Sequence, residues 1–220
     1  ALHYHGSQES AERSRDQLRA EGVSCEAYRA DVAKAVEVER MIEQAVADFQ
    51  RLDVLVTTAS IWNETPLDEV TEEDLRRNFD VNTAGTFFAA RAAGRQMVGQ
   101  PEGGVIITIG DWAISRPELD HAAYYLSKGA IPTLTRMLAV ELGRRNPKVR
   151  VNCIHPGPVM FPPDATEARK QRLRDATLVD GADSPEAVAY AVEGFIKNPF
   201  ITGACLPVDG GRHCYSPEEG

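Results

Sequence analysis

The sequence predicts a doubly wound α/β fold, in which a parallel sheet carries helices on both faces. Short runs rich in Val and Ile alternate with longer amphipathic segments along the 220 residues, and this alternation is typical of such folds. Runs such as Asp53–Thr57 (DVLVT) and Val105–Ile109 (VIITI) are apolar on both faces, as strands covered on two sides require. Because no linker or repeat divides the sequence, one domain over residues 1–220 is predicted.

Six short apolar segments are the predicted strands. In chain order they are Ala1–His5, Val23–Tyr28, Asp53–Thr57, Gly104–Ile109, Val149–Ile154 and Ala204–Val208. Helices are predicted between them. Over Lys34–Phe49, apolar residues recur with the i, i+3, i+4 spacing of one buried helix face; they are Val38, Met41, Ile42, Ala45 and Phe49. A later helix is predicted to begin with Ser184 as N-cap and Pro185 at its first position.

Ligands of doubly wound folds bind beyond the carboxyl ends of the strands. Functional residues are therefore expected in the segments that follow the predicted strands. These segments are Gly6–Ser7, Asp31, Thr58–Trp62, Gly110–Trp112 and His155–Phe161.

Composition narrows the possible partners. The net charge is -9 and no Lys/Arg-rich run occurs, which argues against nucleic acid because its binders need clustered cations. The four cysteines fall in no CxxC or Cys/His ligand spacing, so reduced thiols and no metal site are predicted. No apolar run approaches the roughly 18 residues of a membrane span and no secretory signal pattern occurs. A cytoplasmic protein without a membrane partner is predicted.

Tyr124 and Lys128 stand four residues apart, so on a helix their side chains point the same way. A nearby ammonium favours phenolate and makes Tyr a better proton donor near neutral pH. The alternative for this pair alone is a solvated helix face.

The surrounding motifs decide between these two interpretations. In order and spacing they resemble the short-chain dehydrogenase/reductase family, whose fold is Rossmann-like, over nearly the whole chain. The motifs are DVLVTTAS (Asp53–Ser60), FDVNTAG (Phe79–Gly85), YYLSKGA (Tyr124–Ala130), VNCIHPG (Val151–Gly157) and LPVDGG (Leu206–Gly211).

The resemblance implies hydride transfer with a nicotinamide cofactor. Tyr124 would donate the proton, Lys128 would bind the nicotinamide ribose, and Asn82 would hold the helix and water of the proton path. Pro156 and Gly157 would line the nicotinamide. In addition, Asp31 and Val32 match the family's adenine contacts, Ala59 and Ser60 belong to the turn beside the cofactor, and a homotetramer is expected.

Two departures from the family pattern stand out. The asparagine-rich turn after the fourth family strand is here Thr57-Thr58-Ala59-Ser60, so hydroxyls replace amide groups there. Asp111 occupies the position at which most of the family places a catalytic serine. An ionised Asp only accepts hydrogen bonds, and it would repel the alkoxide that develops during ketone reduction.

Asp111 instead suits a substrate in which a C=N bond is reduced, because a carboxyl paired with Tyr124 can relay a proton to nitrogen. The substitution resembles the pteridine reductase and dihydromonapterin reductase branch of the family. There an aromatic residue two positions after the Ser stacks on the pterin, and Trp62 holds that position after Ser60, which would hydrogen-bond substrate or cofactor phosphate. The alternative for Trp62 is a loop aromatic that covers the core.

The turn after the first strand predicts the coenzyme. NAD-specific sites usually place an acid there for the ribose 2′-hydroxyl, whereas a 2′-phosphate excludes a carboxylate. Here the residues are His5-Gly6-Ser7, so NADP(H) is predicted, with His5 and Ser7 as phosphate contacts. Ser7 could also serve as the N-cap of the next helix, whose N-terminus attracts anions in any case.

The family's glycine-rich loop, with its first strand and helix, has no counterpart in this sequence. We expect that about 30 residues carrying this unit precede Ala1. Since the family places that strand between its second and fourth strands, backbone groups beside Ala1–Tyr28 are expected to lack a neighbour.

The sequence therefore predicts an NADPH-dependent reductase of a pteridine. Two alternatives remain: a reductase of another carbonyl, such as a 3-oxoacyl thioester, and an inactive family member that acts as an oligomeric scaffold.

Overall fold

The computed structural model describes residues 1–162 and 164–215. Its strands are β1 (Leu2–Tyr4), β2 (Ala27–Arg29), β3 (Val54–Thr57), β4 (Gly104–Ile109), β5 (Val149–Pro156) and β6 (Cys205–Val208). Its α-helices are α1 (Gln8–Ala20), α2 (Ala35–Phe49), α3 (Glu72–Asn78), α4 (Gly85–Gly99), α5 (Ala122–Gly129), α6 (Ile131–Gly143), α7 (Glu167–Asp175) and α8 (Glu186–Lys197). A π-helix over Phe79–Ala84 joins α3 to α4, and 3₁₀ turns cover Leu67–Glu69 and Trp112–Ile114.

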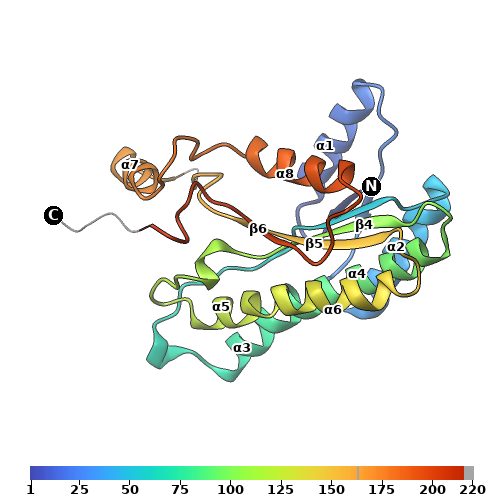
Figure 1. The fold of residues 1–220 in the computed structure, drawn as a ribbon. Coiled ribbons are helices and arrows are strands. Elements are labelled where there is room, and N and C mark those ends of the chain that lie inside the picture. The colour runs from blue at the N-terminus through green and yellow to red at the C-terminus, as the bar shows by residue number, and fades with distance from the viewer. Residues whose placement is uncertain (163, 216–220) are drawn as a thin grey trace.

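The predicted architecture is confirmed. Every strand pair is parallel, and strands alternate with helices along the chain. Helices α4 and α6 cover one face of the larger sheet and α8 covers the other (Figure 1). This is a doubly wound fold, so ligands are expected at the carboxyl ends of the strands.

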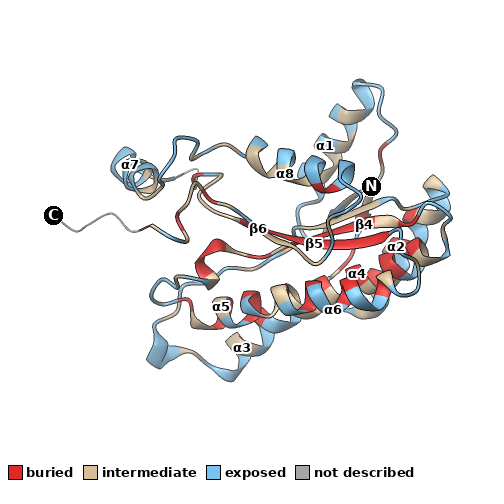
Figure 2. Cartoon of the chain, viewed as in Figure 1, coloured by how far each residue is buried: buried red, intermediate tan, exposed pale blue. Residues whose placement is uncertain are grey.

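The core lies on both sides of β4 and β5, which are the most buried strands (Figure 2). Ile106 and Val151 pack with Leu138 of α6 on one face, whereas Ile107 and Ile154 pack with Phe195 of α8 on the other. Alternate residues of each strand therefore contribute to opposite layers, as the two-faced apolar pattern predicts.

The strands form two sheets. One pairs β1 with β2, and the other has the order β3-β4-β5-β6. A cavity of about 420 Å³ separates β1 from β3 and is lined by Leu2, Tyr28, Val54 and Val56, among others. No strand within residues 1–162 and 164–215 lies in this interval. The expectation that a further strand precedes Ala1 stays a prediction.

Several predicted boundaries differ from the structure, and the largest difference is at the start of β2. Strand β2 begins at Ala27 rather than Val23, because the Val23 amide still bonds the Leu18 carbonyl oxygen (3.0 Å) at the end of α1. Helices α5 and α6 follow one another directly, and Pro132 lies in the first turn of α6, where its missing N–H costs nothing. Helix α8 begins one residue later than predicted, with Pro185 as its N-cap.

None of the helices within the described residues is long and apolar enough to span a bilayer.

Candidate active site

Tyr124 and Lys128 lie on one side of α5 and are both buried. The Lys128 Nζ is 5.9 Å from the centroid of the Tyr124 ring. It donates a hydrogen bond to the Ile109 carbonyl oxygen (3.0 Å) at the carboxyl end of β4. The helix thus holds a phenol and an ammonium together beside the end of a central strand.

The Asp111 carboxylate makes two different contacts. Its Oδ2 accepts a hydrogen bond from the Tyr124 hydroxyl (2.6 Å), and its Oδ1 accepts from the Ala113 amide (2.7 Å). The second contact caps the 3₁₀ turn over Trp112–Ile114. One oxygen is therefore structural, and the other reaches the candidate proton donor.

Burial and the charge of Asp111 both act on the pKa of Tyr124, and in the same direction. Desolvation, followed by the negative charge of Asp111, raises the pKa of Tyr124 above its usual value. Desolvation lowers the pKa of Lys128, although Asp111 opposes this shift. The expectation that Lys128 favours the phenolate form of Tyr124 is therefore wrong, because burial and Asp111 raise the pKa of Tyr124. The phenol stays protonated, so Tyr124 can serve as a proton donor but not as a resting phenolate.

Asn82 lies in the π-helix and is fully buried. Its Oδ1 accepts from the Ile61 amide (2.8 Å) and the Ser60 hydroxyl (3.0 Å). Its Nδ2 donates to the Ile61 carbonyl oxygen and to Ser127 Oγ, both at 3.0 Å. Asn82 therefore joins the loop after β3 to α5, and π-helical turns often occur at functional sites.

We expect Asn82→Ala to destabilise the protein by about 3 kcal/mol, because it leaves several buried partners without a hydrogen bond. For a domain of this size the loss lowers Tm by roughly 6–12 °C. Thermal denaturation followed by circular dichroism measures it. Asn78→Ala is the matched control, since Asn78 is also buried, donates to the Asp74 carbonyl oxygen (2.9 Å) and accepts only a longer bond from Asn82 Nδ2 (3.4 Å). Equal Tm values for the two variants would contradict the bridging role of Asn82.

Trp62 packs on His121, a residue that was not among the predicted site residues. Its ring centroid is 4.5 Å from that of His121, which is buried and bonds the Asn63 carbonyl oxygen through Nδ1 (3.0 Å). The His121 ring meets Tyr125 edge-on at 6.0 Å, next to Tyr124. Because 51% of Trp62 is exposed, it does not cover the core, and it remains free to contact a ligand.

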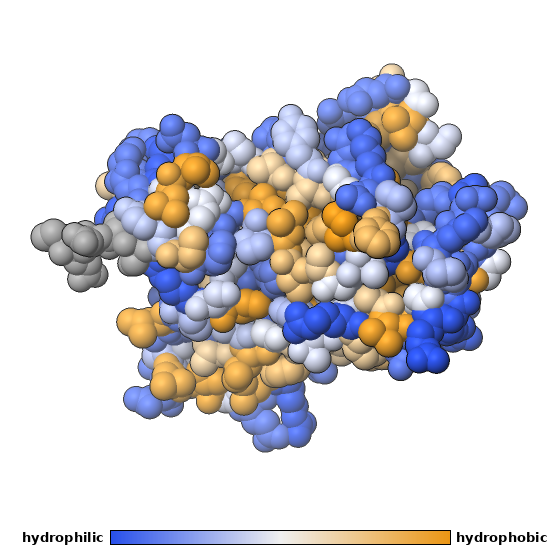
Figure 3. Space-filling view, viewed as in Figure 1, coloured by the Kyte–Doolittle hydropathy of each residue, from blue (hydrophilic) through white to orange (hydrophobic). Residues whose placement is uncertain are grey.

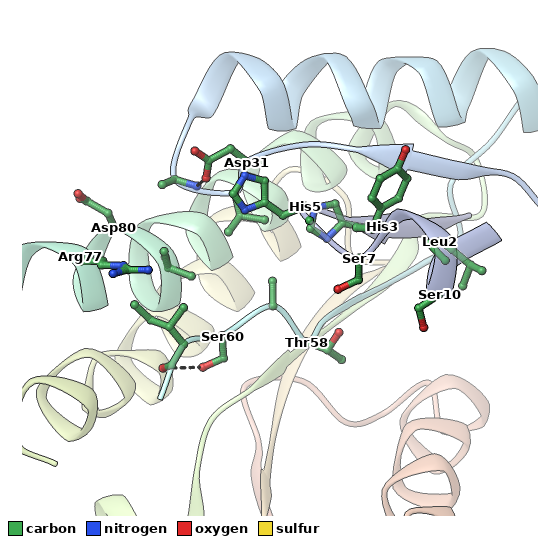
Figure 4. A pocket seen from close by; sticks show the side chains of 18 of the residues that line it. Leu2, His3, His5, Ser7, Ser10, Asp31, Thr58, Ser60, Arg77 and Asp80 are labelled. Atoms are coloured by element: carbon green, nitrogen blue, oxygen red, sulfur yellow. Dashed lines mark hydrogen bonds between the residues drawn. The ribbon is translucent and has the colours of Figure 1, made fainter. Parts of the chain in front are cut away.

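A cavity of about 730 Å³ lies at the carboxyl ends of β1, β2 and β3. It contains most of the predicted cofactor-binding residues, namely His5, Ser7, Asp31, Val32, Ala59 and Ser60. Figure 4 shows His5, Ser7 and Asp31 on one side of this cavity and Thr58 and Ser60 on the other. Three turns that are distant in sequence thus form one site, as the doubly wound topology predicts.

The remaining predicted cofactor residues lie outside the lining of this cavity. Pro156 ends β5, and Gly157 lies against Asp209, where a side chain at position 157 would meet the Asp209 Cβ at 2.5 Å. Tyr124 and Lys128 are also apart from it. Ser60 and Ile61 both line the cavity and bond Asn82, which in turn bonds Ser127 on the helix of Tyr124 and Lys128.

Two further residues near these regions were not among the predicted site residues, although His155 begins one of the segments in which functional residues were expected. Arg77 of α3 lines the cavity, and His155 of β5 places its Nδ1 3.0 Å from the Asp111 carbonyl oxygen. The position of His155 just before Pro156-Gly157, at the end of a strand, was an available signal. Nothing in the local sequence marks Arg77.

The fold and the Asp111–Tyr124–Lys128 cluster beyond a central strand define the protein class as an α/β oxidoreductase. A family model described as enoyl-(acyl carrier protein) reductase matches residues 1–213. The chain belongs to the short-chain dehydrogenase/reductase family, which uses nicotinamide cofactors.

Three relatives illustrate the similarity. An uncharacterized oxidoreductase from Methylorubrum extorquens is 37% identical over 96% of this chain and 86% of its own length. The 3-oxoacyl-[acyl-carrier-protein] reductase of Staphylococcus aureus is 32% identical over 97% of this chain and 87% of its own length. A short-chain dehydrogenase/reductase structure from Serratia marcescens is 33% identical, with a TM-score of 0.86 over 96% of this chain and 86% of that one.

Proposed function

We propose that this oxidoreductase reduces a C=N bond of a pteridine, of the dihydropterin-to-tetrahydropterin type, with NADPH. The observation that carries the proposal is the 2.6 Å hydrogen bond between the Tyr124 hydroxyl and the Asp111 carboxylate. A proton can pass along this bond, whereas a carboxylate next to a developing alkoxide would oppose ketone reduction.

The reduction adds one hydride to carbon and one proton to nitrogen. The nicotinamide supplies the hydride when bound. Tyr124 donates its proton to the substrate nitrogen, and Asp111, protonated from solvent, returns a proton to Tyr124 along the same hydrogen bond. Lys128 offsets the negative charge that arises on Tyr124 during the transfer.

Trp62 supports a flat heterocyclic substrate. One side of its ring packs on His121 while half of the residue stays exposed. A pterin ring stacked there would gain about 0.5–1.5 kcal/mol beyond its area burial. Asp111 can also accept hydrogen bonds from the N–H groups of such a ring.

The turn after β1 supports NADPH over NADH. No carboxylate occurs in His5-Gly6-Ser7, and Ser7 stands at the N-cap of α1 with its side chain making no cap hydrogen bond. The free Ser7 hydroxyl and the first amides of α1 can therefore donate hydrogen bonds to a 2′-phosphate. Arg29 donates to the His5 carbonyl oxygen (3.2 Å), which places a cation beside this turn.

A second candidate is the reduction of a 3-oxoacyl thioester. The observation that favours it is the 32% identity to the reductase of Staphylococcus aureus that carries this name. The acidic residue at position 111 is the feature that argues against it.

The deciding experiment measures NADPH oxidation by the full-length protein with dihydrobiopterin and with an acetoacetyl thioester in parallel, and repeats both with NADH. We expect turnover of the pterin with NADPH and a rate at least roughly tenfold lower with the thioester or NADH. Turnover of the thioester alone would select the second candidate. Inertness toward both substrates, with the cofactor bound, would favour a scaffold role.

The expected cytoplasmic homotetramer also stays a prediction. Apolar side chains gather over α8 and β6 (Figure 3), where Tyr190, Ile196, Phe200 and Leu206 are exposed. A face of this kind supports association of copies of the chain.

A further inference from the structure

Three side chains with metal-binding atoms meet on one face of the sheet, behind the Asp111 loop. Cys153 and His155 are two apart on β5 and therefore share a face. Cys205 of β6 pairs in register with Cys153. The two sulfurs and a ring nitrogen of His155 all lie within 4.8 Å of one another. The fold and the proposed reaction require none of these thiols.

The separations suit one tetrahedral ion. With Zn–S bonds of about 2.3 Å and Zn–N bonds of about 2.0 Å, the donor atoms of a tetrahedral site lie roughly 3.5–3.8 Å apart. Cys153 Sγ already lies 3.7 Å from His155 Nε2. Rotation of the Cys205 side chain, which is only half-buried on the edge strand β6, can close the remaining distance.

The backbone of Asp111 orients the histidine. In one tautomer the Asp111 amide donates to His155 Nδ1 (3.1 Å), and in the other Nδ1 carries the proton and donates to the Asp111 carbonyl oxygen (3.0 Å). In the tautomer that donates to the carbonyl oxygen, the lone pair of Nε2 faces the sulfurs. A metal-bound His usually donates its other ring N–H in this way, so metal binding would select this tautomer.

The ring has little freedom to turn away. Gly110, at the end of β4, approaches the cluster so closely that a Cβ at this position would lie 2.5 Å from His155 Nδ1 and 3.2 Å from Cys153 Sγ. The absence of a side chain at position 110 therefore leaves the room that these donor atoms occupy. Cys153 and His155 are thus fixed by packing, and Cys205 is the adjustable ligand.

A cation lies next to the cluster, because the Arg136 Nη1 is 3.9 Å from Cys205 Sγ. Two thiolates and a neutral imidazole would balance the charge of a divalent ion. Arg136 then remains as an outer partner of Cys205.

We propose that Cys153, His155 and Cys205 bind a single Zn²⁺ ion, with a fourth position open on the solvent side next to Cys205. The sequence predicted no metal site, because the ligands come from two strands that are about fifty positions apart. A bound ion would fix His155 and, through it, the backbone of Asp111.

The test uses the full chain without an affinity tag, fully reduced, in a Cys214→Ser background. This substitution removes the exposed thiol next to His213 as a competing site. Titration with Co²⁺, a spectroscopic substitute for Zn²⁺, should give thiolate-to-metal charge-transfer bands and the visible bands of a tetrahedral ion, and Zn²⁺ should abolish both. Competition with a chromophoric chelator gives the affinity for Zn²⁺.

Cys205→Ser is the decisive variant, because Cys205 is half-buried on an edge strand and serine preserves its shape. Changes to the second shell alone weaken metal sites 10–100-fold, so loss of a ligand is expected to weaken Zn²⁺ binding by more than roughly 100-fold. Cys25→Ser, outside the cluster, should bind Zn²⁺ as the parent does. The proposal is overturned if the reduced parent gives no charge-transfer bands, or if Cys205→Ser binds Zn²⁺ with unchanged affinity.

Discussion

Replacing Tyr124 with Phe is expected to lower kcat for the pteridine about 1,000-fold, within the usual contribution of general acid catalysis. The phenol is the group that can deliver the proton, and its hydroxyl donates to Asp111. Because Asp111 keeps its bond to the Ala113 amide, the fold should survive with a stability change of about 1 kcal/mol. Steady-state kinetics and thermal denaturation measure the two effects.

Tyr125→Phe is the matched control for this prediction. Tyr125 is the next residue of the same helix and is half-buried, and its ring contacts that of Tyr124 at 5.4 Å. We expect its kcat to remain within about twofold of the parent value, because Tyr125→Phe removes only a hydroxyl group and keeps the ring that contacts Tyr124. A Tyr124→Phe variant that kept a tenth of the parent activity would remove Tyr124 as the proton donor.

Asp111→Ser is expected to reduce pteridine turnover about 100-fold while leaving NADPH affinity unchanged. Serine can still cap the 3₁₀ turn through the Ala113 amide, because Ser and Asp are both good caps. The substitution therefore removes the charge and the proton relay but keeps the local structure. We expect activity toward the acetoacetyl thioester to rise at the same time, since the hydroxyl can donate to a developing alkoxide.

The pH dependence of Asp111→Ser follows from the loss of the Asp111 negative charge. Burial is the first cause of the raised pKa of Tyr124 and Asp111 is the second, so removing Asp111 lowers that pKa while burial keeps part of the shift. Tyr124 must be protonated to donate, and activity falls as pH rises through its pKa. The alkaline limb of the pH–rate profile is thus expected at lower pH in Asp111→Ser than in the parent protein.

Asp48→Ser provides the control for loss of a Tyr–Asp hydrogen bond away from the site. The Asp48 Oδ2 accepts from the Tyr28 hydroxyl at 2.7 Å, almost the geometry of the Asp111–Tyr124 pair. Its turnover should stay within about twofold of the parent. If Asp111→Ser also left pteridine turnover unchanged, Asp111 would have no part in the mechanism and the choice of a pteridine would lose its main support.

The sequence by itself determined the layers of the fold and the placement of Tyr124 and Lys128 on one side of a helix. Strands β4 and β5 are predicted by apolar runs, and the parallel doubly wound arrangement follows from their alternation with helices. The four-residue spacing of Tyr124 and Lys128 placed both on one side of α5. These features depend on periodicity along a single segment, which a sequence displays directly.

The tertiary structure decided what meets across segments. The bonds from Asn82 to Ile61 and Ser127, and the approach of Cys205 to Cys153, depend on how loops and strands are placed in space. The register between strands depends on packing of the whole sheet, and no local pattern in either strand records it. The sequence therefore indicated a reductase, whereas only the folded chain showed that Asp111 lies between Tyr124 and a Cys–His–Cys cluster.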